Sequence, residues 1–161
     1  MELDLRRMHN SDIDKVYNFF NNLKSEGAMV SFSDINDKRQ LLQWLNDKNV
    51  FVYLAALNDE IVGVFRGIRG EKYKKHSALL TAAVDVNLRG RKIAQKLTDY
   101  GLKDMKNKGI KIARAYVYSD NNSSVSALLK LGFSLSGSVH MHHFNEDKQI
   151  YVDDLIFHKI L

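Results

Sequence analysis

Three basic side chains surround one glycine near the middle of the chain, in the run Arg89-Gly90-Arg91-Lys92. The run lies between an apolar segment and a segment with helical periodicity, so it is predicted to be a turn from a strand into a helix N-terminus. The first N–H groups of a helix have no partner within the helix, and the helix dipole places about half a positive charge there. This turn therefore predicts a site for a phosphorylated ligand. The alternative is an ordinary helix start with exposed basic residues.

The elements on either side of the turn must hold its backbone N–H groups in position. The run Ala78–Val86 is almost wholly apolar and predicts a strand, which Asn87 interrupts. From about Lys92 to Lys108 the apolar residues recur at helical spacing, and Gly109 is a typical C-terminal stop. The predicted strand leads into the turn, and the predicted helix supplies the free N–H groups.

The rest of the chain contains further predicted strands and helices, with no Pro- or Ser-rich linker and no repeat. We therefore predict a single domain over residues 1–161. Periodicity by itself indicates only a mixed α/β or α+β domain. Further strands are expected at residues 2–8, 50–57, 60–69, 110–118, 133–144 and 149–160, with helices at about 13–23, at about 41–45 after a cap at Ser33 or Asp34, and at about 123–131.

The composition is that of an ordinary globular domain, with 45% apolar and 27% charged residues. The lack of cysteine excludes disulfides, thiolate chemistry and a cysteine-ligated zinc site. No apolar run approaches the roughly 20 residues of a membrane span, and the acidic start lacks the apolar core of a signal peptide. We expect a cytoplasmic location and no membrane partner.

The formal net charge of +5 permits an anionic partner. Nucleic acid is one alternative, but the basic residues are dispersed and the aromatic residues lie in apolar patterns, away from any basic stacking face. We predict no nucleic-acid partner. A small anionic cofactor or a solvated basic surface explains the charge more simply.

The central segment resembles the signature of the GCN5-related N-acetyltransferase (GNAT) superfamily, which is Q/R-x-x-G-x-G/A after a strand that ends in V-x-V. The strand end corresponds to Val84-Asp85-Val86, the first position to Arg89 and the last position to Ala94. Lys92 replaces the middle glycine.

A second block strengthens the resemblance. Asn121, Leu131, Gly132 and Phe133 match the family element N-x-x-A-x-x-x-Y-x-x-x-G-F at the right spacing. The predicted order of elements, β-α-α-β-β-β-α-β-α-β-β, is also that of the family. The resemblance implies an α/β (α+β) fold of the acyl-CoA N-acyltransferase kind, with a mixed, mostly antiparallel central sheet of about seven strands and about four helices.

The resemblance further implies acetyl-CoA as the cofactor, with its pantetheine arm along the strand that holds Val84, Asp85 and Val86. The turn would bind the pyrophosphate through Arg89, Gly90, Arg91, Lys92, Ile93 and Ala94. Since a Cβ obstructs the approach of backbone to phosphate, either the turn tolerates Lys92 and its ammonium pairs with the phosphates, or the turn binds coenzyme A weakly. Asn121 matches the family residue that contacts the cofactor arm; the alternative is a helix cap, for which Asn122 competes.

The reaction that the resemblance implies is direct attack of an amine on the thioester, which needs a proton donor for the departing thiolate. The usual family acid, a tyrosine four residues before Gly132, is here Leu128. The usual base, a glutamate in the strand before the turn, is missing from residues 77–83, where Leu79 is the corresponding position. Tyr118 is the substitute acid that we consider; the alternative is an ordinary strand aromatic.

Polar side chains of the last two predicted strands are candidates for the acceptor site. Strand alternation places His140 and His142 on one face, and His143 is their neighbour. An imidazole accepts a proton near neutral pH, although surface histidines are the simpler interpretation. Asp153 resembles a recurrent acidic position of small-amine acetyltransferases and would hold a cationic substrate or make a structural hydrogen bond. We predict no metal site, because no ligand cluster accompanies the histidines.

The sequence therefore predicts an N-acetyltransferase that transfers the acetyl group of acetyl-CoA to a primary amine of a small or amino-acid-like molecule in a ternary complex. One alternative is acetylation of a protein N-terminus or lysine. A second is a non-catalytic sensor or regulatory module that binds acyl-CoA, which Leu128 and Leu79 favour. Members of the family often dimerise, so a homodimer is an expectation here too.

Overall fold

A seven-stranded sheet forms the centre of the protein, in a computed structural model that describes residues 2–161. The strand order is β1-β2-β3-β4-β5-β7-β6, and every neighbouring pair is antiparallel except β4 and β5, which are parallel. The predicted fold class is confirmed. The strands are β1 (Asp4–Arg7), β2 (Val50–Leu57), β3 (Glu60–Arg69), β4 (Ser77–Val84), β5 (Ile112–Tyr118), β6 (Ser134–Asn145) and β7 (Ile150–Ile160).

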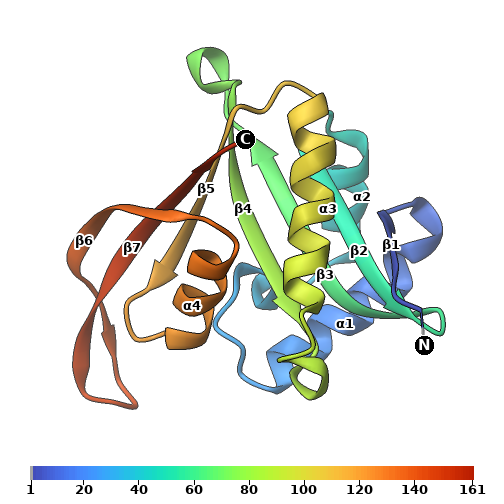
Figure 1. The fold of residues 1–161 in the computed structure, drawn as a ribbon. Coiled ribbons are helices and arrows are strands. Elements are labelled where there is room, and N and C mark those ends of the chain that lie inside the picture. Colours follow the sequence, from blue (N-terminus) through green and yellow to red (C-terminus); the bar gives the residue numbers. More distant parts are fainter. Residues whose placement is uncertain (1) are drawn as a thin grey trace.

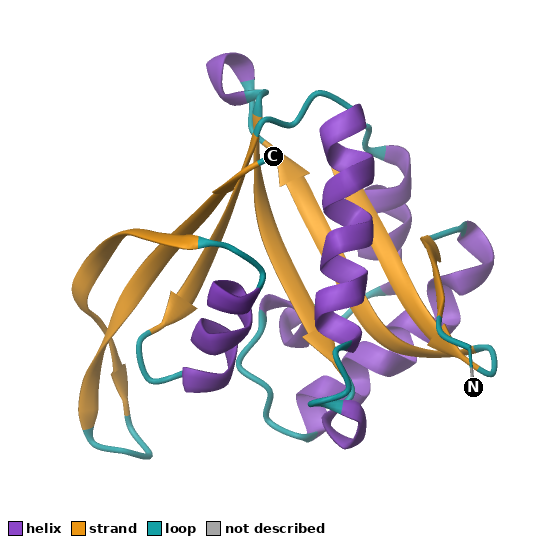
Figure 2. Cartoon of the chain, viewed as in Figure 1, coloured by secondary structure: helices purple, strands orange, loops and turns teal. Residues whose placement is uncertain are grey.

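Four α-helices cover the two faces of the sheet, and Figures 1 and 2 show their placement. One face carries α1 (Ile13–Ser25) and α2 (Lys38–Asn46), and we call it the α1/α2 face. The other carries α3 (Ile93–Asn107) and α4 (Asn122–Lys130), and we call it the α3/α4 face. Because β2 and β3 lie between both layers, most of their residues are buried.

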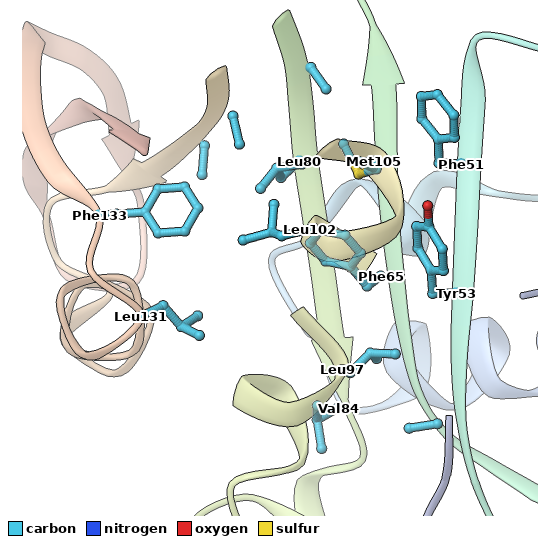
Figure 3. Close-up of a cluster of buried hydrophobic side chains, with 14 of the residues drawn as sticks. Phe51, Tyr53, Phe65, Leu80, Val84, Leu97, Leu102, Met105, Leu131 and Phe133 are labelled. Atoms are coloured by element: carbon cyan, nitrogen blue, oxygen red, sulfur yellow. The ribbon is translucent and has the colours of Figure 1, made fainter. Parts of the chain in front are cut away.

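Each face has its own apolar core. Apolar residues of α1, which recur at helical spacing, pack on β2 and β3 on the α1/α2 face. On the α3/α4 face, α3 places Leu97, Leu102 and Met105 against the sheet. Figure 3 shows Leu131 and Phe133, which follow α4, facing this cluster from the side of β5. The second half of the chain is thus fixed to the first half by apolar packing on this face.

Two predicted boundaries are wrong for local reasons. The strand expected to end at Val86 ends at Val84, because the Asp85 carboxylate accepts a hydrogen bond from the Asn87 N–H at 2.8 Å and turns the chain into a 3-10 helix, Val86–Leu88. Val86 is consequently exposed.

The second boundary is the cap of α2. The carboxylate of Asp37 accepts a hydrogen bond from the Arg39 N–H at 2.8 Å and caps the helix. The residues expected to cap it, Ser33 and Asp34, lie in a separate 3-10 helix, Ser31–Asp34.

Among residues 2–161, no helix is both long and apolar enough to cross a membrane.

Candidate active site

The parallel strands β4 and β5 separate soon after they meet. Three residue pairs join them, from Ser77–Ile112 to Leu79–Arg114, although β4 continues to Val84 and β5 to Tyr118. Figure 1 shows the two strands diverging below this point, with α4 beside the gap. The divergence opens the middle of the sheet at the end where β4 leads into the basic turn.

The edge of β4 that faces this gap has main-chain groups without a strand partner. The Asp85 N–H donates to the Val62 carbonyl, and the Ser77 carbonyl accepts from the Gly70 N–H. Since an antiparallel strand directs alternate residues to each neighbour, the N–H and C=O groups of Ala82 and Val84, which lie beyond the last β4–β5 pair, point away from β3 and towards the gap. An extended amide-containing chain fits there as an added strand.

The turn between β4 and α3 contains two residues with left-handed backbone. Gly90 has φ +80° and Lys92 has φ +61° and ψ +18°. Lys92 therefore occupies a position whose conformation favours glycine, which explains why the family pattern has glycine there. The structure supports the interpretation that this turn tolerates a side chain, and the Lys92 side chain is exposed.

The beginning of α3 offers free hydrogen-bond donors. The first intrahelical bond runs from the Lys96 N–H to the Lys92 carbonyl, so the N–H groups of Ile93, Ala94 and Gln95 have no acceptor within the helix. No side chain of the described residues caps this end. Arg91 and Lys92 are exposed beside it. Three free donors and two cations at a helix N-terminus suit a diphosphate.

Arg89 does not extend freely around the turn. Its Nη2 lies 2.6 Å from the Glu26 carboxylate at the end of α1, and its Nε donates to the Val84 carbonyl at 3.3 Å. A phosphate bound at the turn would therefore compete with Glu26 for the Arg89 guanidinium.

Comparisons with known proteins identify the chain. A sequence model of the Acetyltransferase (GNAT) family matches residues 13–133. The chain belongs to the GNAT acetyltransferase family. The resemblance that the two sequence blocks indicated is thereby confirmed. No curated protein matches the sequence.

Solved structures share the fold over nearly the whole chain. The protein smu.2055 from Streptococcus mutans UA159 has 26% identity and a TM-score of 0.82, covering 99% of each chain. A GNAT-family acetyltransferase from Streptococcus pneumoniae has 18% identity and a TM-score of 0.84, covering 99% of this chain and 100% of that one.

A third structure, yncA from Salmonella typhimurium, was solved with its cofactor acetyl-CoA. It has 15% identity and a TM-score of 0.85, covering 99% of this chain and 94% of that one. Acetyl-CoA is the acetyl donor of the GNAT family, and our chain is an acetyl-CoA-dependent acetyltransferase. The unpaired edge of β4 and the free donors of α3 fit that cofactor.

In this acetyltransferase Asn121 caps α4. Its side-chain oxygen accepts from the Ser124 N–H at 3.2 Å and from the Ser123 hydroxyl at 3.2 Å, whereas Asn122 is the first helical residue. The cap interpretation is thus confirmed for Asn121. No hydrogen bond within residues 2–161 uses its amide nitrogen, so that donor is open to a ligand.

The two candidate positions for the acid lie on different faces of the sheet. Leu128 of α4 packs against the core on the α3/α4 face. On β5, Ala113 and Ala115 are buried in that same core, so alternation directs Tyr118 to the α1/α2 face. There its ring stacks on His143, with the centroids 4.5 Å apart and the planes 3° from parallel.

The prediction that His140 and His142 share a face is wrong. Between the pairs Val139–Asp154 and His143–Val152, three residues of β6 oppose one residue of β7, and Met141 has φ +49°. Strict alternation fails in such a bulge. The His140 Nδ1 lies 3.1 Å from the Asp153 carboxylate, whereas the His142 Nε2 lies 4.0 Å from Asp154.

Asp153 has internal partners in this structure. Its carboxylate accepts from the Met141 N–H at 2.9 Å and contacts His140, and these two contacts lower the pKa of Asp153. A structural hydrogen bond, one of the two roles considered from the sequence, is therefore present. Among residues 2–161 no three His, Cys, Asp or Glu side chains are grouped to hold a metal.

The prediction from sequence missed Arg66. It lies on β3, and its Nη2 is 3.3 Å from the Thr81 hydroxyl on β4 and 3.3 Å from the Ser31 hydroxyl in the α1–α2 connection. The available signal was its spacing, because Arg66 follows Val64 by two residues and therefore falls on an inward-facing position of an apolar strand.

Proposed function

We propose that this acetyltransferase acts on the primary amine of a small or amino-acid-like molecule, which attacks acetyl-CoA directly in a ternary complex. The observation that carries the proposal is the bridge made by Arg66. Its guanidinium joins Ser31 of the α1–α2 connection to Thr81 of β4, two residues beyond the last β4–β5 pair. The α1–α2 connection is thereby held against β4 on the α1/α2 side of the gap. This favours a confined acceptor site rather than a long open groove.

The cofactor-binding residues that we propose follow the geometry of the turn and the gap. The main chain of β4 up to Val84, with Asp85 and Val86 after it, would orient the pantetheine arm. The N–H groups of the run 89–94 would bind the pyrophosphate, and the side chains of Arg91 and Lys92 would add charge. The free amide nitrogen of Asn121 would donate to the arm from the opposite side of the gap.

Acetyl-CoA supplies the activated acetyl group, which passes from the sulfur to the amine nitrogen as the thiol departs. The chain's residues contribute position and protons. Unpaired N–H groups on β4 would hold the reacting carbonyl close to the amine, and such positioning can supply much of the acceleration. We propose Tyr118 as the proton donor, and His140, His142 and Asp153 as residues near the acceptor.

A protein acceptor is the second candidate. One structural neighbour is a ribosomal-protein-alanine N-acetyltransferase from Brucella melitensis, with 20% identity, a TM-score of 0.83 and coverage of 98% of this chain and 99% of that one. A likeness at this identity shows the fold alone, so it does not decide between a peptide and a small amine.

The test is thiol release from acetyl-CoA across two panels of acceptors at matched concentration. One panel holds small primary amines and free amino acids, and the other holds peptides with a free N-terminus or an internal lysine. We expect turnover with members of the first panel and little with the second. Turnover confined to peptides would overturn the proposal and support the second candidate.

A further inference from the structure

The guanidinium of Arg66 is a half-buried cation without an anionic partner. No carboxylate within residues 2–161 lies within 4.0 Å of its nitrogens. Its carbon Cζ lies 4.5 Å from the ring centroid of Trp44 in α2 and 5.2 Å from that of Phe32. The aromatic rings hold the planar group in one place and partly offset its charge.

Most hydrogen-bond donors of this guanidinium have no acceptor or only a distant one. A guanidinium has five N–H groups, and the bonds found for Arg66 are two long ones of 3.3 Å from Nη2 to the hydroxyls of Ser31 and Thr81. Its Nε is buried with no acceptor in the described part of the chain. Burial without a counter-ion lowers the pKa of Arg66 to about 10. Such a group gains from a carboxylate, which accepts two parallel hydrogen bonds from its fork.

A second arginine of the same strand, Arg69, also has a buried Nε without an acceptor in the described residues, but one of its other nitrogens makes a short main-chain bond. Arg69 also lies over an aromatic ring, that of Phe51 at 5.4 Å. Its Nη2 donates to the main-chain carbonyl of Lys108 at 2.6 Å. Arg69 is thus bound firmly to the protein itself, whereas Arg66 has only two weak hydroxyl partners.

The position of Arg66 connects it with the acceptor. Arg66 and Thr81 are paired positions of β3 and β4, and Leu79, two residues before Thr81, is the last β4 residue paired with β5. The guanidinium therefore lies on the α1/α2 face where the gap begins. Ser31 is exposed and Thr81 is half-buried, so the Nη2 edge of the guanidinium faces a region that solvent reaches.

We propose that Arg66 binds a carboxylate of the acceptor, so that the substrate of this acetyltransferase is an amine that carries a carboxylate, as free amino acids do. This inference rests on the proposed function and narrows it. The carboxylate replaces the two long hydroxyl contacts with charge-assisted bonds, and it fixes the amine of the same molecule beside the diverging strands. Arg66 is in this account a specificity-determining residue.

The experiment compares the twenty standard L-amino acids with their α-carboxamides as acceptors, by steady-state thiol release from acetyl-CoA. We expect the wild type to prefer an acid over its amide. Arg66→Met should lower kcat/KM for the acid by about 30-fold or more, mainly through KM, and change that for the amide by less than about twofold. Arg69→Met is the matched control and should leave the ratio of acid to amide unchanged.

A second variant and a comparison of rates separate the carboxylate role of Arg66 from a general loss of activity. If Arg66→Met does not fold, Arg66→Lys keeps the charge but loses the planar fork, and it should still reduce the acid-to-amide ratio. If the wild type acetylates small amines without preferring acids, or if Arg66 variants lower the rates for acids and amides equally, the carboxylate role is overturned while the proposed function stands.

If no small amine releases thiol, the proposed function fails, and calorimetry then decides on Arg66 separately. In that case L-amino acids are titrated into the wild type and into Arg66→Met, each saturated with coenzyme A. Binding that Arg66→Met abolishes supports the carboxylate site, and absence of binding to the wild type overturns it.

Discussion

The guanidinium of Arg89 and the carboxylate of Glu26 form an ion pair, with 2.6 Å between Nη2 and Oε1. Glu26 ends α1, and Arg89 begins the final part of the turn that leads into α3. The pair thus connects the turn that we propose binds the pyrophosphate to a helix on the other face of the sheet. If Arg89 contacts the phosphates of coenzyme A, as we propose, the Glu26 carboxylate competes with them for the same cation.

This competition predicts opposite effects from the two partners. Glu26→Gln should tighten coenzyme A binding several-fold, because the guanidinium is released, whereas Arg89→Gln should weaken it. The pair is partly exposed, so either change should alter the free energy of unfolding by less than about 1 kcal/mol. Calorimetric titration with coenzyme A at low and high salt measures the affinities. Equal weakening by both variants would contradict the competition.

Lys92 allows charge and backbone conformation to be separated. A side chain at φ +61° costs roughly 1 kcal/mol, and the greater freedom of glycine in the unfolded chain cancels part of any gain. Lys92→Gly should therefore stabilise the fold by about 0.5 kcal/mol, and Lys92→Ala should not. If the ammonium contacts the phosphates, Lys92→Ala weakens coenzyme A binding more than Lys92→Gly does, because glycine lets the backbone approach more closely. Tighter binding by Lys92→Ala would show that the ammonium makes no favourable contact.

The free edge of β4 can be tested with proline, which removes one N–H group. The Ala82 N–H points into the gap, so Ala82→Pro should keep the fold and weaken coenzyme A binding by about tenfold or more. The Ala83 N–H belongs to the ladder with β3, so Ala83→Pro is the contrasting variant and should cost about 3 kcal/mol of stability. Urea unfolding and coenzyme A titration distinguish the two effects. Unchanged affinity in Ala82→Pro would show that the cofactor does not pair with this edge.

Tyr118 is tested by removing only its hydroxyl. If it protonates the departing thiolate, Tyr118→Phe should lower the rate at saturating substrate by about 100-fold, with little change in cofactor affinity. Stacking on His143 is retained by phenylalanine, so the packing is preserved. Tyr116→Phe is the control, because Tyr116 lies on the same strand and face but is exposed. Wild-type rates in Tyr118→Phe would leave Tyr118 as a packing residue.

Stability in acid depends on Asp12, which lies before α1. Its two carboxylate oxygens accept from Arg6 at 2.6 and 2.7 Å, and one also accepts from the His9 N–H at 2.8 Å. Desolvation is the largest single influence and raises the pKa, but the hydrogen bonds and charge of Arg6, together with His9, outweigh it and hold the pKa of Asp12 below 3.8. A lowered folded-state pKa gives stabilisation that is complete above pH of about 4 and is lost as the pH falls through the folded-state value.

Asp12→Asn should therefore cost roughly 3 kcal/mol at pH 7, and the cost should shrink below pH of about 4. Asp14→Asn is the matched control, because Asp14 is an exposed neighbour paired with the exposed Lys38. That variant should cost less than about 0.5 kcal/mol at any pH. Urea unfolding between pH 3 and pH 7 measures both. A cost for Asp12→Asn that does not vary with pH would contradict the ionic role of Asp12.

Much of the fold was predictable from local patterns. The strands β2 and β3 begin and end where the apolar run and the Asn58-Asp59 turn predict. The start of α3 follows from the change of apolar period after the run Arg89-Gly90-Arg91-Lys92. The proposed phosphate-binding turn was predictable for the same reason, since a helix N-terminus is a local structure whose donors lie within a few residues of one another.

What the sequence by itself determined is the set of elements, their order and the residues of the turn, because each depends on neighbours along the chain. Only the tertiary structure decided which side chains of distant elements meet. Packing across the sheet brought Arg66 beside Trp44 and Thr81, and a bulge in β6 separated His140 from His142. No repeating pattern in the sequence predicts either arrangement. Both result from the way in which strands far apart in the chain pair with one another.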